Sequence, residues 1–137
     1  MTQQNELESL VGNVIYAYTR ADAIADGTLV DVSRMAREAG FRLPVAMTAA
    51  AWADCVAWSE ADSTRQTVQD EAGRLWDVLW MSSRAARHAW GERVAFQFYR
   101  IPHGGRATRP RLTTLHLHIG PGDAGEPVVT ILMPNED

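Results

Sequence analysis

From Arg93 to the C-terminus, apolar and polar residues alternate with a period of two. The alternation passes through three segments, RVAFQFYRI, LTTLHLHIG and EPVVTILMP, with Gly- and Pro-rich stretches between them. This period is typical of strands that bury one face, and the Gly and Pro residues indicate turns. We therefore predict an antiparallel meander. Its expected core positions are Leu115, Leu117, Ile119, Val129 and Ile131, whereas His116 and His118 lie on the opposite face.

In the middle of the chain the period is helical. Apolar residues recur every three or four positions over residues 68–89. This pattern predicts a long helix that begins at Asp62 or Ser63 and continues to about Trp90. A shorter helix, AAAWADCVAWS, precedes it, with Thr48 as its N-cap.

The N-terminal third contains shorter elements. Residues 1–12 predict a frayed end, and the segment NVIYAY, residues 13–18, has the β-branched and aromatic residues of a strand. Thr19 is a suitable N-cap for the helix RADAIAD, which Gly27 ends. Ser33 is in the same way the expected N-cap of the helix RMAREAG.

These elements predict a single domain over residues 1–137, a length sufficient for one core. The expected fold is α+β, a three- to four-stranded, mainly antiparallel sheet with helices packed on one face. The fourth strand is the N-terminal one, and it joins the sheet either at an edge or centrally.

Charge is distributed unevenly along the chain. The net charge is −5 over residues 1–62, +5 over residues 63–111 and −4 over residues 112–137, which gives −4 in total. A net negative protein is a poor general binder of nucleic acid. Every fixed cation is an arginine, so reactions that need a Schiff-base lysine or a P-loop lysine are excluded.

The single cysteine, Cys55, excludes an internal disulfide and fits a reducing compartment. Because Trp52 and Trp58 flank it on an apolar helix, we interpret Cys55 as a buried packing residue rather than a nucleophile. The N-terminus lacks the basic and apolar regions of a signal peptide, and no apolar run approaches the ~20 residues that span a bilayer. These features predict a cytoplasmic protein without membrane association.

His116 and His118 form an H-x-H pair, a spacing that metal sites use. A third ligand would have to be His103 or a carboxylate that the sequence does not place. We favour a polar sheet face here and predict no metal. Common motifs for nucleophilic or metal-dependent catalysis are absent from the sequence, so we assign no catalytic residue and no cofactor.

Five tryptophans are present, and Trp76 and Trp80 lie one turn apart on the predicted long helix. Buried tryptophans fill space, and this is the default interpretation. If Trp80 and Trp90 project away from the apolar face, they would be exposed near arginines. Exposed tryptophan with arginine is typical of protein-binding hot spots.

The segment RIPHGGRATRPR connects the first two predicted strands of the meander, and its glycines predict mobility. Its four guanidinium groups could bind phosphate or an acidic protein surface. They belong to Arg100, Arg106, Arg109 and Arg111. The alternative is a solvated loop.

The stretch YAYTRADAIADGTL resembles the first motif of ADP-ribosyltransferase-like folds, in which a strand with Tyr-His-x-Thr precedes a helix and a Gly-x-Leu. Tyr16, Thr19 and the Gly-x-Leu at Gly27 match, whereas Ala17 stands at the histidine position. The resemblance implies that Glu126 takes the role of the late glutamate of that fold. It also implies that NAD is not bound, because the missing histidine holds the nicotinamide ribose.

A broader resemblance covers most of the chain. Four segments carry it: AYTRADAIADGTLVDVSRMAREAGFRLPVAMT, WADCVAW, DEAGRLWDVLWM and GPGDAGEPVVTILMP. Together they resemble an uncharacterised family of small proteins carried on plasmids, phages and integrative elements. The resemblance implies no chemistry, but it implies a setting in which small acidic proteins often inhibit host defence, anti-CRISPR proteins among them.

The sequence thus favours a non-enzymatic binding protein that blocks or modulates a host protein complex. The expected partner has a basic, nucleic-acid-binding surface, which the acidic N- and C-terminal segments of this chain would complement. One alternative is an ADP-ribosyltransferase-like enzyme, active or degenerate. Another is a nucleic-acid-associated protein that uses the 100–111 hairpin. The residues predicted to bind the partner are Asp22, Asp26, Asp31, Asp123, Glu126, Trp80 and Trp90.

Overall fold

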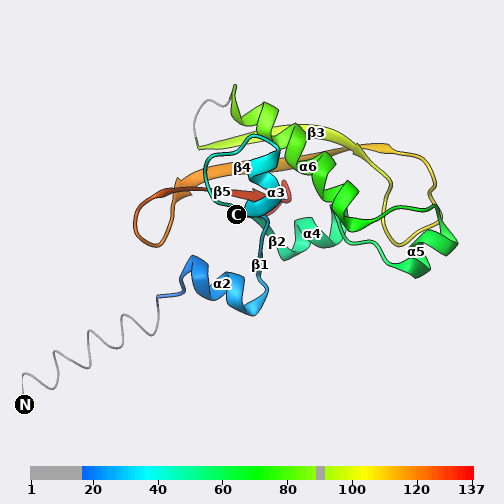
Figure 1. Cartoon of the computed structure of the whole chain (residues 1–137), viewed down its shortest axis with the longest axis horizontal. Coiled ribbons are helices and arrows are strands. Elements are labelled where there is room, and N and C mark those ends of the chain that lie inside the picture. Colours follow the sequence, from blue (N-terminus) through cyan, green and yellow to red (C-terminus); the bar gives the residue numbers. More distant parts are fainter. Residues whose placement is uncertain (1–16, 89–91) are drawn as a thin grey trace, which may run out of the picture.

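The computed structural model describes residues 17–88 and 92–137, and Figure 1 shows their arrangement. A five-stranded sheet has the strand order β1-β2-β5-β4-β3. The strands are β1 (Leu29–Asp31), β2 (Val45–Thr48), β3 (Arg93–Arg100), β4 (Arg111–Pro121) and β5 (Pro127–Leu132). The helices are α2 (Arg20–Asp26), α3 (Ser33–Glu38), α4 (Ala49–Cys55), α5 (Glu60–Arg65) and α6 (Glu71–Ala86). The α+β class is confirmed.

The C-terminal meander is confirmed, together with its predicted buried face. β4 pairs antiparallel with β3 on one side and with β5 on the other. Leu115, Leu117, Val129 and Ile131 are at most 1% exposed, and Ile119 is partly buried against the same cluster. The side chains of His116 and His118 alternate with these leucines and point to the opposite face of the sheet.

The other half of the sheet differs from the sequence prediction, because β1 and β2 extend it to five strands. β2 pairs parallel with β5 and antiparallel with β1. Val45, Ala46 and Met47 are all buried, so β2 has no polar face and shows no alternation. The strand predicted over residues 13–18 lies mostly outside the described residues, and Ala17 and Tyr18 have no regular secondary structure.

The prediction of one long helix from Asp62 or Ser63 to Trp90 is wrong. Two helices, α5 and α6, occupy this region, and residues 66–70 separate them. Each has its own N-cap, Ser59 for α5 and Asp70 for α6. Val68, which fits the apolar periodicity, is 86% exposed in the connection. α6 ends at Ala86, and Trp90 lies outside the described residues.

The predicted helix caps are mostly confirmed. Thr19 and Thr48 accept hydrogen bonds from backbone N–H groups in the first turns of α2 and α4, and Gly27 ends α2 with a φ of 85°. Ser33 is the exception, because it is the first residue of α3 rather than its N-cap. Its hydroxyl accepts a hydrogen bond from the Val45 N–H at 3.0 Å and so joins α3 to β2.

Three helices, α3, α4 and α6, cover one face of the sheet, as predicted (Figure 1). Their buried residues include Ala36 of α3, Ala51 of α4 and Leu79 of α6. α2 lies elsewhere: its Arg20 donates to Thr130 Oγ1, on the other face of β5 from Ile131. Within the part of the chain that the structure describes, no helix has the length and apolar character needed to cross a membrane.

Candidate functional site

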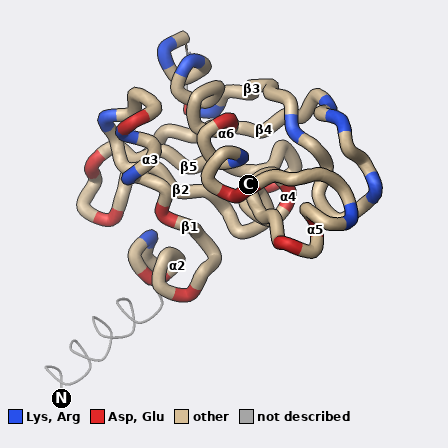
Figure 2. The backbone as a smooth tube through the Cα atoms, turned by 45° about the vertical axis from the view of Figure 1, so that its right-hand side comes forward, with Lys and Arg blue, Asp and Glu red and all other residues tan. Residues whose placement is uncertain are grey.

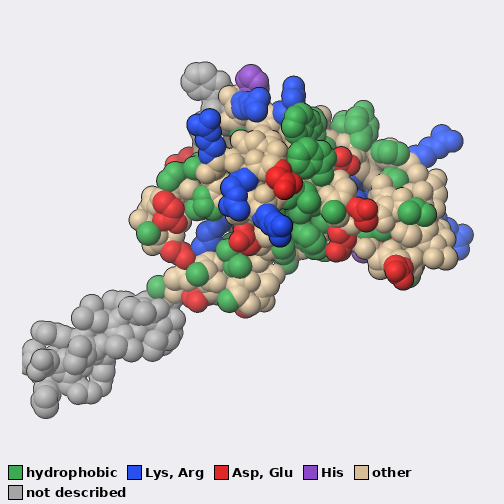
Figure 3. Space-filling model, viewed as in Figure 1, with side chains coloured by type: hydrophobic (Ala, Val, Ile, Leu, Met, Phe, Trp, Pro, Cys, Tyr) green, Lys and Arg blue, Asp and Glu red, His purple; other side chains and the backbone are tan. Residues whose placement is uncertain are grey.

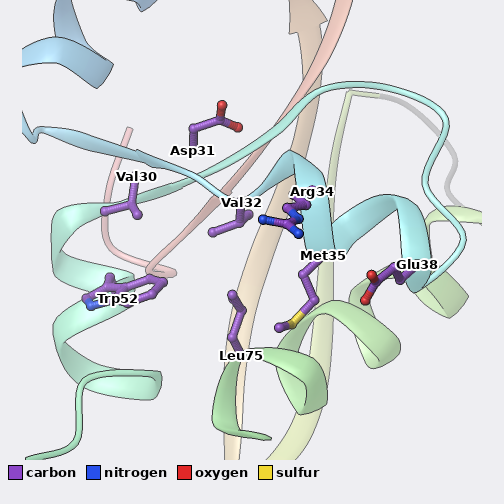
Figure 4. A pocket seen from close by; sticks show the side chains of 8 residues that line it. All are labelled: Val30, Asp31, Val32, Arg34, Met35, Glu38, Trp52 and Leu75. Atoms are coloured by element: carbon purple, nitrogen blue, oxygen red, sulfur yellow. The ribbon is translucent and has the colours of Figure 1, made fainter. Parts of the chain in front are cut away.

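An apolar groove lies between β1, α3, α4 and α6 on the helical side of the sheet. It encloses about 340 Å³. Its apolar lining consists of Val30, Val32, Met35, Trp52 and Leu75. Figure 4 shows Trp52, Leu75 and Met35 pointing toward the shared space from three different helices, while Asp31 points away.

Two charged side chains of opposite sign stand at the rim of this groove. Arg34 and Glu38 are one turn apart on α3, and both are exposed. Neither takes part in a salt bridge within the described residues. The groove therefore combines an apolar floor with polar groups at its edge, which is the composition of a binding site.

Beside the groove, α6 carries a stacked tryptophan pair, Trp76 and Trp80. Their ring centroids are 5.7 Å apart with an interplanar angle of 22°. They are 36% and 42% exposed, and the Arg84 guanidinium lies 5.4 Å from the Trp80 ring centroid. Figure 3 shows hydrophobic side chains gathered over this side of the molecule. For this pair the default interpretation of buried tryptophans is wrong, and Trp80 follows the alternative, exposure near an arginine.

The acidic residues predicted to bind a partner gather around α2, and Figure 2 shows acidic positions there. Asp123, from the turn between β4 and β5, accepts hydrogen bonds from Arg20 N at 2.7 Å and Ala21 N at 3.0 Å. Asp22 completes the capping box of the same helix. These two carboxylates are exposed, yet each already holds the N-terminal turn of α2.

The other three acids also have local hydrogen-bond partners. The Thr28 hydroxyl donates to Asp26 at 2.6 Å, and this contact is the main cause that lowers the pKa of Asp26. Ser33 donates to Asp31 at 3.0 Å and lowers the pKa of that carboxyl. Glu126 accepts a hydrogen bond from the backbone N–H of residue 124. The acidic cluster thus supports the fold, and its side chains remain open to solvent.

The arginine hairpin is hydrogen-bonded to the segment that follows α5. The Gln66 side-chain amide donates to the carbonyls of Pro102 and Ala107, at 2.8 and 2.7 Å. Arg100 pairs with Asp54 at 2.8 Å and is mostly buried. The remaining arginines of the set, Arg106, Arg109 and Arg111, are exposed. Figure 2 shows basic positions along this hairpin.

The histidines do not converge on one point. Arg93 Nε donates to His116 Nδ1 at 2.8 Å, and His118 lines a separate depression on the same face of the sheet. His103 instead contacts Asp62 on α5 at 2.8 Å. Among the described residues, no three side chains of His, Cys, Asp or Glu come close enough together to hold a metal ion.

Asp62 is the centre of a polar network that the sequence interpretation missed. The residue is 3% exposed and accepts hydrogen bonds from Ser59 N, His103 Nε2 and Arg65. The Ser59 N–H, followed by the Ser59 hydroxyl and His103, lowers the pKa of Asp62 to about 2. The signal was present in the sequence, because Ser59 and Asp62 have the spacing of a capping box.

The residues that carry the ADP-ribosyltransferase resemblance have local roles where they are described. Thr19 caps α2 and Gly27 ends it. Glu126 holds the turn before β5 through its hydrogen bond to the backbone. Tyr16 lies outside the described residues.

The fold and the site together define a small α+β protein with an apolar groove beside an exposed aromatic pair. The chain belongs to a family of unknown function, DUF6573, whose model matches residues 7–137. Neither a curated protein nor a solved structure is significantly similar to it.

Proposed function

We propose that this protein is a non-enzymatic binding protein that holds a partner protein on the apolar groove and the tryptophan pair. The exposed stack of Trp76 on Trp80 carries the proposal. Large aromatic rings left in water are costly for a small domain, and they become hot spots when a partner buries them.

The chemistry of the groove indicates the kind of segment that it accepts. An amphipathic helix of the partner would insert apolar side chains between Trp52 and Met35. Charges on either side of that helix would meet Arg34 and Glu38 at the rim. Because these two rim charges have opposite signs, they would fix the direction in which the helix lies.

The proposed setting is a plasmid, phage or integrative element, where the protein blocks or modulates a host complex, such as a CRISPR effector. The exposed acidic cluster around α2 supports a partner with a basic, nucleic-acid-binding surface. In this proposal the groove supplies most of the affinity, and the acidic cluster raises the rate of association.

Replacing Trp80 by Ala should weaken partner binding by about 30-fold or more, the effect of a typical hot spot. Leu112→Ala is the matched control, because Leu112 is a 54% exposed apolar residue on β4. The measurement is the Kd of the partner captured by the wild-type chain, followed by reconstitution of that complex. A partner that binds Trp80→Ala and the wild type equally would contradict the assignment of the groove.

The salt dependence of partner binding distinguishes the contribution of the groove from that of the acidic cluster. Binding through the groove should persist at high ionic strength, whereas the association rate should fall with salt if the acidic cluster steers the encounter. Charge reversal at Glu126 tests the cluster with a small structural cost, because it removes one hydrogen bond within the β4–β5 turn. Reversal at Asp123 would also remove the contact that holds the N-terminus of α2.

We expect no binding of NAD, which separates this proposal from an ADP-ribosyltransferase-like enzyme. Ala17 stands where that fold has its cofactor-holding histidine. Calorimetry with NAD and an assay for nicotinamide release provide the measurement. Nicotinamide release that disappears in Glu126→Ala would support the enzyme and overturn the non-enzymatic proposal.

A further inference from the structure

Arg74 of α6 is a buried cation in the described part of the chain, with neutral groups around its guanidinium. It is 4% exposed. Its Nε donates to the Val56 carbonyl at 3.1 Å, and its Nη1 donates to Gln69 Oε1 at 2.7 Å and to the Ile101 carbonyl at 2.9 Å. The guanidinium also lies 4.5 Å from the centroid of the Trp58 ring. All these partners are uncharged.

One nitrogen of this guanidinium has no partner. Within residues 17–88 and 92–137, Arg74 Nη2 is the one buried side-chain nitrogen or oxygen without a hydrogen bond. No carboxylate of these residues lies within 4.0 Å of the Arg74 nitrogens. A buried charge without a counterion and with an unsatisfied donor is costly, so such a group marks a place where a ligand would bind.

A small cavity of about 70 Å³ lies against Arg74. Arg100 also lines it, so two arginine side chains border one space. Its wall includes the exposed residues Asp77 and Tyr99, so the cavity opens to the surface. One water needs roughly 10–15 Å³ of such space, and this cavity therefore has room for a small polyatomic ion.

No acidic group among the described residues forms an ion pair with Arg74, although Asp54 and Asp62 favour its charged form from a longer distance. Burial raises the pKa of the Cys55 thiol to about 12, so this thiol carries no charge at neutral pH. The carboxylate of Asp54 already pairs with Arg100. Asp77 lies at the mouth, outside salt-bridge distance of Arg74, and its negative charge repels any anion, a doubly charged one more strongly than a singly charged one.

We infer that the cavity between Arg74 and Arg100 binds a single carboxylate group. A carboxylate is planar and carries one charge, and it accepts the forked hydrogen bonds that guanidinium groups donate. The group comes either from a free small carboxylate or from an acidic side chain of another polypeptide. This site is separate from the apolar groove, since the two share no lining residue.

The test is an NMR titration of the full chain with sodium formate at constant ionic strength, with sodium chloride as the control salt. The Trp58 indole N–H and the Arg74 Nε–H report on the site, because the guanidinium stacks on this ring. We expect saturable shifts of both signals with formate and none with chloride. Shifts that do not saturate, or that chloride reproduces, would overturn the inference and leave a water-filled cavity.

Asp77→Asn provides a test that leaves Arg74 and its structural contacts intact. Because it removes the like charge at the mouth, formate should bind about tenfold more tightly. Asp70→Asn is the control: Asp70 is the N-cap of the same helix, lies outside the cavity and is replaced by a residue that caps equally well, so the Kd should stay unchanged. An Asp77→Asn variant with unchanged or weaker formate binding would contradict the site. Arg74→Met should abolish binding, provided that it folds.

A second titration identifies the source of the carboxylate. The probe is a capped Gly-Asp-Gly peptide added to the formate complex. Displacement of formate by the peptide assigns the site to an acidic side chain of a polypeptide. Saturable formate binding without displacement assigns it to a free small carboxylate. Either result supports the carboxylate site and is independent of the proposed partner at the groove.

Discussion

Leu117→Ala should lower the free energy of unfolding by about 2–5 kcal/mol, because it leaves a cavity in the centre of the core. Leu117 is 1% exposed and lies on β4, between Val94 of β3 and Ile131 of β5. β4 and β5 are each paired on both sides, whereas β3 is an edge strand, so the backbone around Leu117 and Ile131 can move little to fill the space. Urea denaturation of the two proteins gives the difference directly.

Leu112→Ala is the control for this experiment, since it removes the same atoms from the same strand. Leu112 is 54% exposed, and its truncation should change stability by no more than about 0.5 kcal/mol. Equal losses in the two variants would show that the alternation along β4 does not define the buried face. A neutral Leu117→Ala would contradict the packing of the whole meander.

β3 and β4 could be predicted because each alternates between a buried and a more exposed face, and β5 because Gly- and Pro-rich turns bound its β-branched residues. β2 could not, since both of its faces are covered and its sequence is therefore a short apolar run. Val68 led to the opposite error, because a helix was predicted where the structure has a connection. It continues the helical spacing of α6 but lies exposed in the connection before that helix, where the side chains of Ser59 and Asp70 decide the helix boundaries.

The candidate site was accessible to sequence reasoning only in part. The spacing of Trp76 and Trp80 predicts that they are neighbours, and their exposure was one of two open alternatives. The groove beside them is assembled from β1, α3, α4 and α6, which no local pattern brings together.

The structural roles of the acidic cluster could not be predicted either, because some of its contacts join segments that are far apart in the sequence. Asp123 hydrogen-bonds to the backbone of Arg20, 103 residues away. A turn residue in the sequence therefore gives no sign that it holds a helix at the other end of the chain.

The Asp62 network should make the stability of the protein depend on pH in the acid range. The pKa of Asp62 is about 2 in the folded protein, below the ordinary aspartate value of 3.8. A carboxyl whose pKa is depressed by folding stabilises the native state in full above the unfolded pKa. This contribution is lost as the pH falls from about 4 through 2, because unfolding then takes up a proton at this group.

Asp62→Asn should remove that part of the pH dependence. Between pH 4 and 2, unfolding of the wild type should take up as much as about one proton more than unfolding of the variant. The measurement is the urea midpoint of both proteins at closely spaced pH values. Parallel curves for the two proteins would show that the contacts of Asp62 with Ser59, His103 and Arg65 do not favour its charged form.

Ser59→Ala separates the stabilisation due to the Asp62 carboxylate from the stabilisation due to the N-cap of α5. It removes the hydroxyl that caps α5 and should cost about 1 kcal/mol at neutral pH. It keeps the Ser59 backbone N–H, which is the largest cause of the low pKa of Asp62. The variant should therefore be less stable at every pH and still lose stability between pH 4 and 2.

His103 belongs to the β3–β4 hairpin, so protonation of Asp62 weakens a contact between this hairpin and α5. Faster amide exchange in residues 101–110 between pH 4 and 2 would report that the hairpin is released from α5.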